Sequence, residues 1–118
     1  MKNKRIYNII PGKQIDDSSI IDSIFLLIDS VSFDEWIELN EDIYNEDFFN
    51  IYEEFYVMYL DPAEIIKRLY LSTCEEIVTF MKEYINCRYS EGVDIAICTK
   101  QINNAVICNH DGQVFLLY

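Results

Sequence analysis

Residues 93–118 read VDIAICTKQINNAVICNHDGQVFLLY, and the prediction of the fold class begins from this stretch. It holds three short runs rich in β-branched and aromatic residues, VDIAICT, NAVICN and QVFLLY. An Asn-Asn pair at 103–104 and an Asp-Gly pair at 111–112 stand between the runs, and both pairs tolerate the positive φ angles of tight hairpins. The stretch predicts a three-stranded antiparallel meander, to which RIYNII at residues 5–10 can add a fourth strand.

The chain ahead of this stretch shows helical periodicity instead. Apolar residues recur at spacings of three and four, and capping residues mark where each helix is expected to begin. These caps are Asp17 or Ser18, Ser32 with Glu35, Asn45, Asp61 ahead of Pro62, and Ser72 with Glu75. The first helix carries Ile20, Ile21, Ile24, Phe25, Leu27, Ile28 and Val31 as its apolar set. The second is short, with Phe33, Trp36 and Ile37 inward. The third carries Phe48, Ile51, Tyr52, Phe55 and Tyr59 on one stripe. The last is expected to reach about Arg88.

Helices first and strands last predict an α+β domain. Its N-terminal helices are expected to pack on a C-terminal three- or four-stranded antiparallel sheet. With 118 residues, the chain is long enough for one hydrophobic core, so we expect a single globular domain over residues 1–118.

The formal net charge of −12 is confined to one part of the chain. Residues 1–13 carry four bases and no acid, residues 14–66 carry fifteen acids and no base, and residues 67–118 carry five bases and six acids. An ordinary helix surface mixes both signs, because Glu–Lys pairs four residues apart stabilise it. A solubility bias would act on every segment. The segregation therefore favours an acidic surface that attracts a basic partner.

The densest part of the acidic block is residues 32–56, SFDEWIELNEDIYNEDFFNIYEEFY. It holds nine carboxylates, eight aromatic rings and no lysine or arginine. Aromatic anchors within a rim of one charge sign are typical of protein-binding surfaces. The carboxylates predicted to bind a partner are Asp34, Glu35, Glu38, Glu41, Asp42, Glu46, Asp47, Glu53 and Glu54. The predicted aromatic anchors are Trp36, Tyr44 and Tyr56.

The residues that could carry catalysis or bind metal form no recognised motif. Cys108 and His110 would share one face of a strand, with Cys98 across the hairpin, but no spacing supplies a fourth zinc ligand or an oxyanion hole. We therefore expect a core cysteine and a turn histidine, with no catalytic residue, no metal and no cofactor. The four cysteines are expected to be reduced thiols.

Composition also bears on partners and location. The acidic excess repels nucleic acid and anionic lipid, and the three glycines are isolated, so no phosphate-binding loop is indicated. The sequence contains no window of eighteen apolar residues, so no membrane span is predicted. The basic start, MKNKRIYNIIPGK, lacks the apolar run of a secretory signal. A cytoplasmic protein is expected.

The acidic, ring-rich stretch EDIYNEDFFNIYEEFY at residues 41–56, in a small α+β chain, resembles the bacterial immunity proteins. These are the cognate inhibitors of contact-dependent growth-inhibition toxins, colicins and related polymorphic toxins. The resemblance implies a stoichiometric inhibitor of a basic toxin domain, often a nuclease, made by the same cell.

Two other functions are consistent with the sequence. A phage-type inhibitor that imitates nucleic acid would use carboxylates in place of phosphates against a DNA-binding host or defence enzyme. Genomic position separates the two inhibitors, because an immunity gene lies directly downstream of its toxin gene. The third reading is an enzyme that uses Cys108 and His110, which thiol alkylation or removal of the histidine would test.

Overall fold

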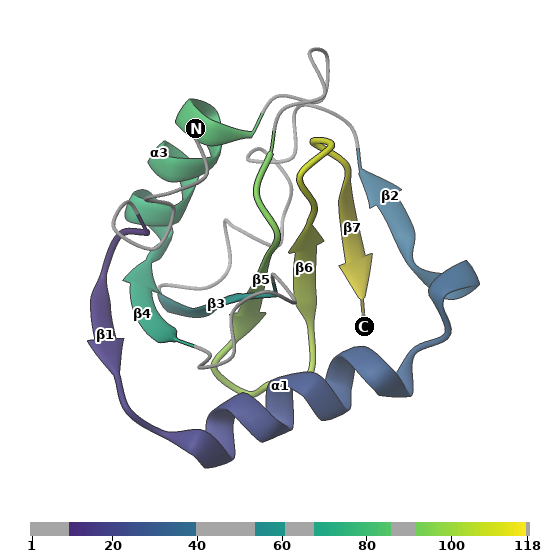
Figure 1. Cartoon of the computed structure of the whole chain (residues 1–118), viewed down its shortest axis with the longest axis horizontal. Coiled ribbons are helices and arrows are strands. Elements are labelled where there is room, and N and C mark those ends of the chain that lie inside the picture. Colours follow the sequence, from purple (N-terminus) through teal and green to yellow (C-terminus); the bar gives the residue numbers. More distant parts are fainter. Residues whose placement is uncertain (1–9, 40–53, 61–67, 86–91, 118) are drawn as a thin grey trace.

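A computed structural model describes residues 10–39, 54–60, 68–85 and 92–117, and every structural statement below refers to these ranges. Their elements in chain order are β1 (Lys13–Ile15), α1 (Ser18–Ser30), the 3₁₀ turn η2 (Phe33–Glu35), β2 (Ile37–Leu39), β3 (Glu54–Tyr59), β4 (Leu69–Thr73), α3 (Cys74–Tyr84), β5 (Ile95–Thr99), β6 (Ala105–Cys108) and β7 (Val114–Leu117). The strands form one seven-stranded antiparallel sheet in the order β1-β4-β3-β5-β6-β7-β2 (Figure 1).

The C-terminal meander is confirmed. β5, β6 and β7 pair in sequence, with Ile97 opposite Val106 and Val106 opposite Leu116. At the β6–β7 turn, Gly112 adopts a φ of 82°, as the Asp-Gly pair predicts. At the β5–β6 turn, however, Ile102 and not an asparagine takes the positive φ, of 56°. The side chain of Ile102 packs against the apolar cluster beneath α1, which offsets the strain of this conformation.

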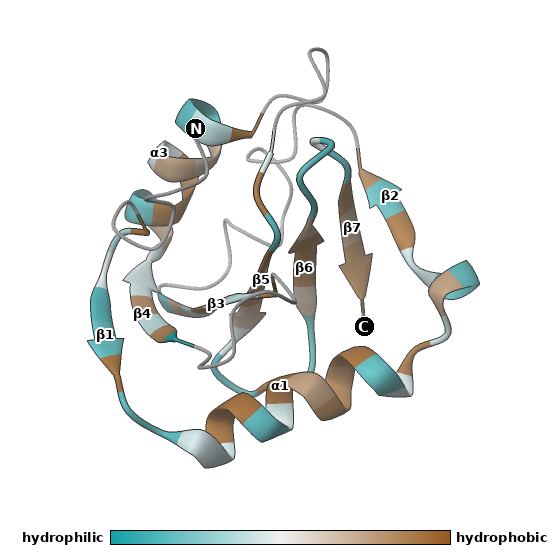
Figure 2. Cartoon of the chain, viewed as in Figure 1, coloured by the Kyte–Doolittle hydropathy of each residue, from teal (hydrophilic) through white to brown (hydrophobic). Residues whose placement is uncertain are grey.

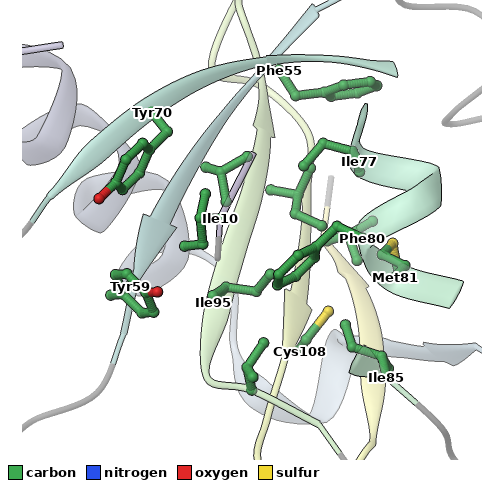
Figure 3. Packing of buried hydrophobic residues seen from close by; sticks show 14 of the residues in the cluster. Ile10, Phe55, Tyr59, Tyr70, Ile77, Phe80, Met81, Ile85, Ile95 and Cys108 are labelled. Atoms are coloured by element: carbon green, nitrogen blue, oxygen red, sulfur yellow. The ribbon is translucent and has the colours of Figure 1, made fainter. Parts of the chain in front are cut away.

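The two α-helices pack on opposite faces of the sheet. On β3, Val57 belongs to the cluster that contains Ile77 of α3, whereas its neighbour Met58 belongs to the cluster that contains Ile24 of α1. Successive side chains of a strand point to opposite faces, so the two clusters lie on the two sides of one sheet. Figure 3 shows the side chains of α3, among them Phe80, directed at the strands on their face.

Helix α1 joins the two edges of the sheet. It follows β1 and precedes β2, and these are the first and last strands in the sheet order. Figure 1 shows α1 running along one end of the sheet between these edges. Asp17 caps the helix by accepting hydrogen bonds from the Ser19 and Ile20 amides, at 3.1 and 3.3 Å, as the sequence predicts. Hydrogen bonds from the Ser19 hydroxyl and then from the Ile20 amide lower the pKa of the Asp17 carboxyl.

The predicted arrangement of N-terminal helices on a C-terminal three- or four-stranded sheet is wrong, although the α+β class is correct. Residues 54–59 and 69–73 are strands that precede α3. Phe55 and Tyr59 are four residues apart and so fit a helical stripe, but Phe55, Val57 and Tyr59 also fit an alternating pattern. These residues form a strand and not a helix because the sheet buries the side chains of β3 on both faces.

Two predicted caps also differ from the structure. Helix α3 begins one residue later than predicted: Thr73 and Glu76 form the capping box, with the Glu76 amide donating to Thr73 Oγ1 at 3.2 Å and the Thr73 amide to Glu76 Oε1 at 2.9 Å. Ser72 lies in β4, where its hydroxyl donates to the Pro11 carbonyl at 2.7 Å.

The expected helix at Ser32 is a single 3₁₀ turn followed by β2. The Ser32 side chain accepts no hydrogen bond from the amides of the turn, and its hydroxyl donates to the Asp34 carboxylate. The helices expected to begin at Asn45 and Asp61, and the strand expected at residues 5–10, lie outside the described residues, apart from the segments already placed above.

Candidate functional site

The candidate site is built where α1 turns into the edge strand β2. The η2 turn supplies Phe33, Asp34 and Glu35, Trp36 follows it, and β2 supplies Glu38; we call these five residues the acidic–aromatic surface. The three carboxylates are exposed, and the Phe33 side chain is 67% exposed although it is a large hydrophobic group. A ring left largely in water among carboxylates realises only a small part of the stabilisation that its burial would give.

Three aromatic rings fix the shape of this surface. The ring centroids of Phe33 and Trp36 lie 5.0 Å apart, those of Phe33 and Phe115 5.7 Å, and those of Trp36 and Phe115 5.9 Å, all tilted. Such pairs contribute roughly 0.5–1.5 kcal/mol each beyond burial. The indole Nε1–H of Trp36 also donates to the Val31 carbonyl at 3.1 Å. Trp36 therefore supports the exposed Phe33 ring from behind and is itself only half exposed.

The register of β2 places Glu38 on the same side as the rings. Glu38 lies opposite Phe115, whose side chain points to the α1 face of the sheet. Directly opposite residues bring their Cβ atoms to roughly 5 Å. One carboxylate thus stands beside the aromatic cluster, while Ile37, 42% exposed, points to the other face.

The electrostatic setting of this surface is uniformly negative. Residues 16–38 carry seven acids and no base. None of the seven forms an ion pair with another described residue, whereas Glu54 pairs with Lys100 Nζ at 3.2 Å and Asp94 with His110 Nδ1 at 3.2 Å. Within the part of the chain that the structure describes, residues 16–38 therefore contribute seven carboxylates that have no ion-pair partner.

The structure describes six of the twelve predicted partner-binding residues and brings four of them together. Those four are Asp34, Glu35, Trp36 and Glu38. Glu54 and Tyr56 lie on β3, four strands away from β2 in the sheet order, or roughly 19 Å at ordinary strand spacing. Tyr56 is half-buried against the cluster beneath α1. The other six lie outside the described residues: Glu41, Asp42, Tyr44, Glu46, Asp47 and Glu53.

Sequence reasoning missed three exposed apolar residues, one of which is Ile37, expected to point inward but 42% exposed. Phe33 was expected to point inward because a capping box at Ser32 implied a helix, but the 3₁₀ turn directs the ring outward. Leu26 on α1 is 71% exposed. A signal for it was present, because Leu26 falls outside the apolar set of its own helix and has Asp22 and Asp29 on either side.

The candidate cysteine–histidine cluster is not assembled. Cys98 points to the α1 face and Cys108 to the α3 face, so the two thiols lie on opposite sides of the sheet. Cys108 is buried, as predicted, and His110 lies in the β6–β7 turn beside Asp94. Nowhere in the described ranges do three or more His, Cys, Asp or Glu side chains gather as a metal site requires.

The three cysteines that the structure describes, Cys74, Cys98 and Cys108, are thiols and not half-cystines. Burial raises the pKa of the Cys98 thiol to about 12. Burial, and then the neighbouring Glu75 carboxylate, raise the pKa of the half-buried Cys74. Neither is a low-pKa nucleophile. Cys87 lies outside the described residues.

The fold and the site together define an antiparallel α+β protein with an acidic, ring-bearing surface at one sheet edge. Comparison with protein-family models, with curated proteins and with solved structures finds no match to this chain. In the described ranges, no helix has both the length and the apolar character that crossing a membrane demands.

Proposed function

We propose that this protein is an immunity-type inhibitor that binds and neutralises a basic toxin domain through its acidic–aromatic surface. The observation that carries the proposal is the exposed Phe33 ring, held by Trp36 and Phe115 amid carboxylates that have no basic partner among the described residues. A surface shaped only by solubility needs the carboxylates but not the exposed ring.

The mechanism is physical and needs no bond chemistry. A nuclease domain must hold phosphates, so its binding surface is rich in lysine and arginine. A field of opposite sign steers such a domain towards the inhibitor and can raise the association rate to about 10⁸ M⁻¹s⁻¹ or more at low salt. Once docked, the Phe33 ring loses its contact with water, which slows dissociation.

The proposal is tested by neutralisation of the toxin domain encoded directly upstream in the native genome. Cells that express this domain are rescued by co-expression of the wild-type chain, and we expect the E35Q/E38Q variant to lose at least about tenfold in apparent affinity. The matched control is E75Q/E83Q, which removes two exposed carboxylates from α3 on the opposite face of the sheet. It is expected to protect like the wild type.

Two outcomes would contradict the proposal. Equal loss in both variants would show that only the overall net charge matters. Full rescue by E35Q/E38Q together with an F33S substitution would show that the toxin binds elsewhere or not at all. A chain that inhibits a DNA-binding enzyme, competes with duplex DNA and rescues no toxin would instead be a nucleic-acid mimic.

A further inference from the structure

A second apolar feature lies on the outward side of α1. A groove of about 480 Å³ runs between the helix and the β5–β6 turn, lined by Ser23, Leu26, Leu27, Ser30, Gln101 and Ile102. Leu27 and Ile102 also pack into the cluster beneath α1, so the floor of the groove is anchored to the core. Leu26 stands on its rim with 71% of its surface in water.

The fold does not need Leu26 in this position. The buried face of α1 is supplied by Ile24 and by half-buried neighbours such as Ile20 and Ile28. Burying a leucine side chain stabilises a protein, and Leu26 realises little of this stabilisation in the isolated chain. The side chain is therefore available to a partner.

The charges on this helix face identify the kind of partner. Asp22 lies four residues before Leu26 and Asp29 three residues after it, so all three share one face of α1. Both aspartates are exposed, and they stand roughly 10 Å apart along the helix axis. On this protein, Leu26 lies between two carboxylates. A complementary partner would present an apolar side chain between two bases.

A second copy of this chain does not offer an apolar side chain between two bases. Two α1 helices packed antiparallel would bring Asp22 of each close to Asp29 of the other, and like charges at such distances repel. An extended segment fits less well than a helix. Side chains on one face of a strand repeat about every 6.8 Å, so bases two residues to either side of an apolar residue stand about 13.6 Å apart.

We propose that this groove binds an amphipathic helix of the basic partner, with an apolar residue seated beside Leu26 and lysine or arginine three or four residues to either side. Bases at these spacings are about 10 Å apart along the partner helix, which matches the separation of Asp22 and Asp29. This inference takes from the proposed function only that the partner is a basic protein. It adds a site separate from the acidic–aromatic surface.

The probe is a synthetic helix that does not depend on knowing the partner. A side-chain-stapled peptide carries a central leucine with lysines three and four residues to either side, and a control peptide has serine in place of that leucine. Binding is followed by fluorescence anisotropy of the labelled peptide at low and at physiological salt. The intact chain is compared with its L26S, D22N/D29N and F33S variants, all of which alter exposed side chains.

We expect the leucine peptide to bind the wild type about tenfold or more tightly than the serine peptide. L26S should abolish that difference, and D22N/D29N should weaken binding and flatten its salt dependence. F33S is expected to bind the peptide like the wild type. The proposal is overturned if neither peptide binds, if both bind equally, or if L26S leaves binding unchanged.

Self-association gives a further decisive outcome. If the wild type sediments as a dimer and the L26S variant as a monomer, a second copy occupies the groove. That result would refute the proposed helical partner. The two proposals fail separately: loss of toxin neutralisation in E35Q/E38Q concerns the acidic–aromatic surface, whereas the peptide and L26S concern only the groove. Intact neutralisation by E35Q/E38Q with normal peptide binding would reject the first proposal and keep the second.

Discussion

Phe33, and not Trp36, is the ring that this surface exposes to a partner. Tryptophan is the usual anchor at a protein interface, yet Trp36 is half-buried and held by a hydrogen bond to Val31. Phe33 is the exposed ring, and its tilted packing on Trp36 and Phe115 keeps it in a defined position. A ring already fixed in place loses little conformational entropy on binding, so it suits a hot spot.

Cys98 provides a prediction at the scale of a residue. Its pKa of about 12 lies above the ordinary thiol value of 9.0, so the folded state favours the protonated form. Because the pKa is raised, the stability that this thiol contributes is present below about pH 9 and is lost as pH rises towards 12. At pH 8 only about one Cys98 in ten thousand is a thiolate, against roughly one in ten for an exposed cysteine.

We therefore expect iodoacetamide at pH 8 to modify Cys98 far more slowly than Cys74 in the native protein. Mass spectrometry of the digested chain measures each site, and unfolding in urea should make the two rates equal. Rapid native modification of Cys98 would contradict its burial on the α1 face of the sheet.

Among the elements, α1 has an unfavourable charge–dipole interaction near its C-terminus. Its last turn contains no base, and Asp29 stands near the C-terminus, where the helix dipole is negative. Natural surfaces usually place lysine or arginine there. A carboxylate that opposes the stability of its own helix is expected where partner binding matters more than helix stability.

The prediction for this element is that D29N stabilises the chain. The free energy of unfolding should rise by about 0.3–1 kcal/mol, because an unfavourable charge–dipole interaction is removed. D22N, nearer the middle of α1, is the matched control and should change stability less. Urea unfolding measures both, and a destabilised D29N would mean that the carboxylate makes a favourable contact that outweighs the dipole.

Across the molecule, the acidic residues that the structure describes are unevenly distributed. In the described residues, α1, η2 and β2 carry acids alone between positions 16 and 38, while α3 carries Lys82 among its glutamates. Figure 2 shows that the strands β5, β6 and β7, which lie inside the sheet, are largely apolar. The net charge is thus presented asymmetrically, and an asymmetric field orients an approaching basic protein.

The corresponding prediction concerns the rate of association with the basic toxin domain. Raising the salt concentration from about 0.03 to 0.5 M should slow association at least about tenfold, because the Debye length shortens. E35Q/E38Q should show a shallower dependence than E75Q/E83Q. Stopped-flow fluorescence of Trp36, the single tryptophan of the chain, provides the measurement. A rate that does not change with salt would exclude electrostatic steering.

Elements whose signals are local can be predicted from the amino-acid sequence alone. Asp17 specifies the start of α1 through hydrogen bonds to nearby amides, and the short apolar runs on either side of an Asp-Gly turn specify β6 and β7. Charge segregation is likewise a property of the sequence, and it pointed to the segment where Asp34, Glu35 and Glu38 lie together.

The arrangement of the sheet and the identity of the exposed apolar side chains depend instead on contacts between distant parts of the chain. Residues 54–59 fit both a helical and an alternating pattern, and pairing with β4 and β5, distant in sequence, selects the strand. The outward positions of Phe33 and Leu26 follow from packing, because the sheet and its clusters already bury the rings and aliphatic groups beside them. Burial depends on which surfaces meet across the whole chain, so local patterns do not specify which apolar residues are left in water.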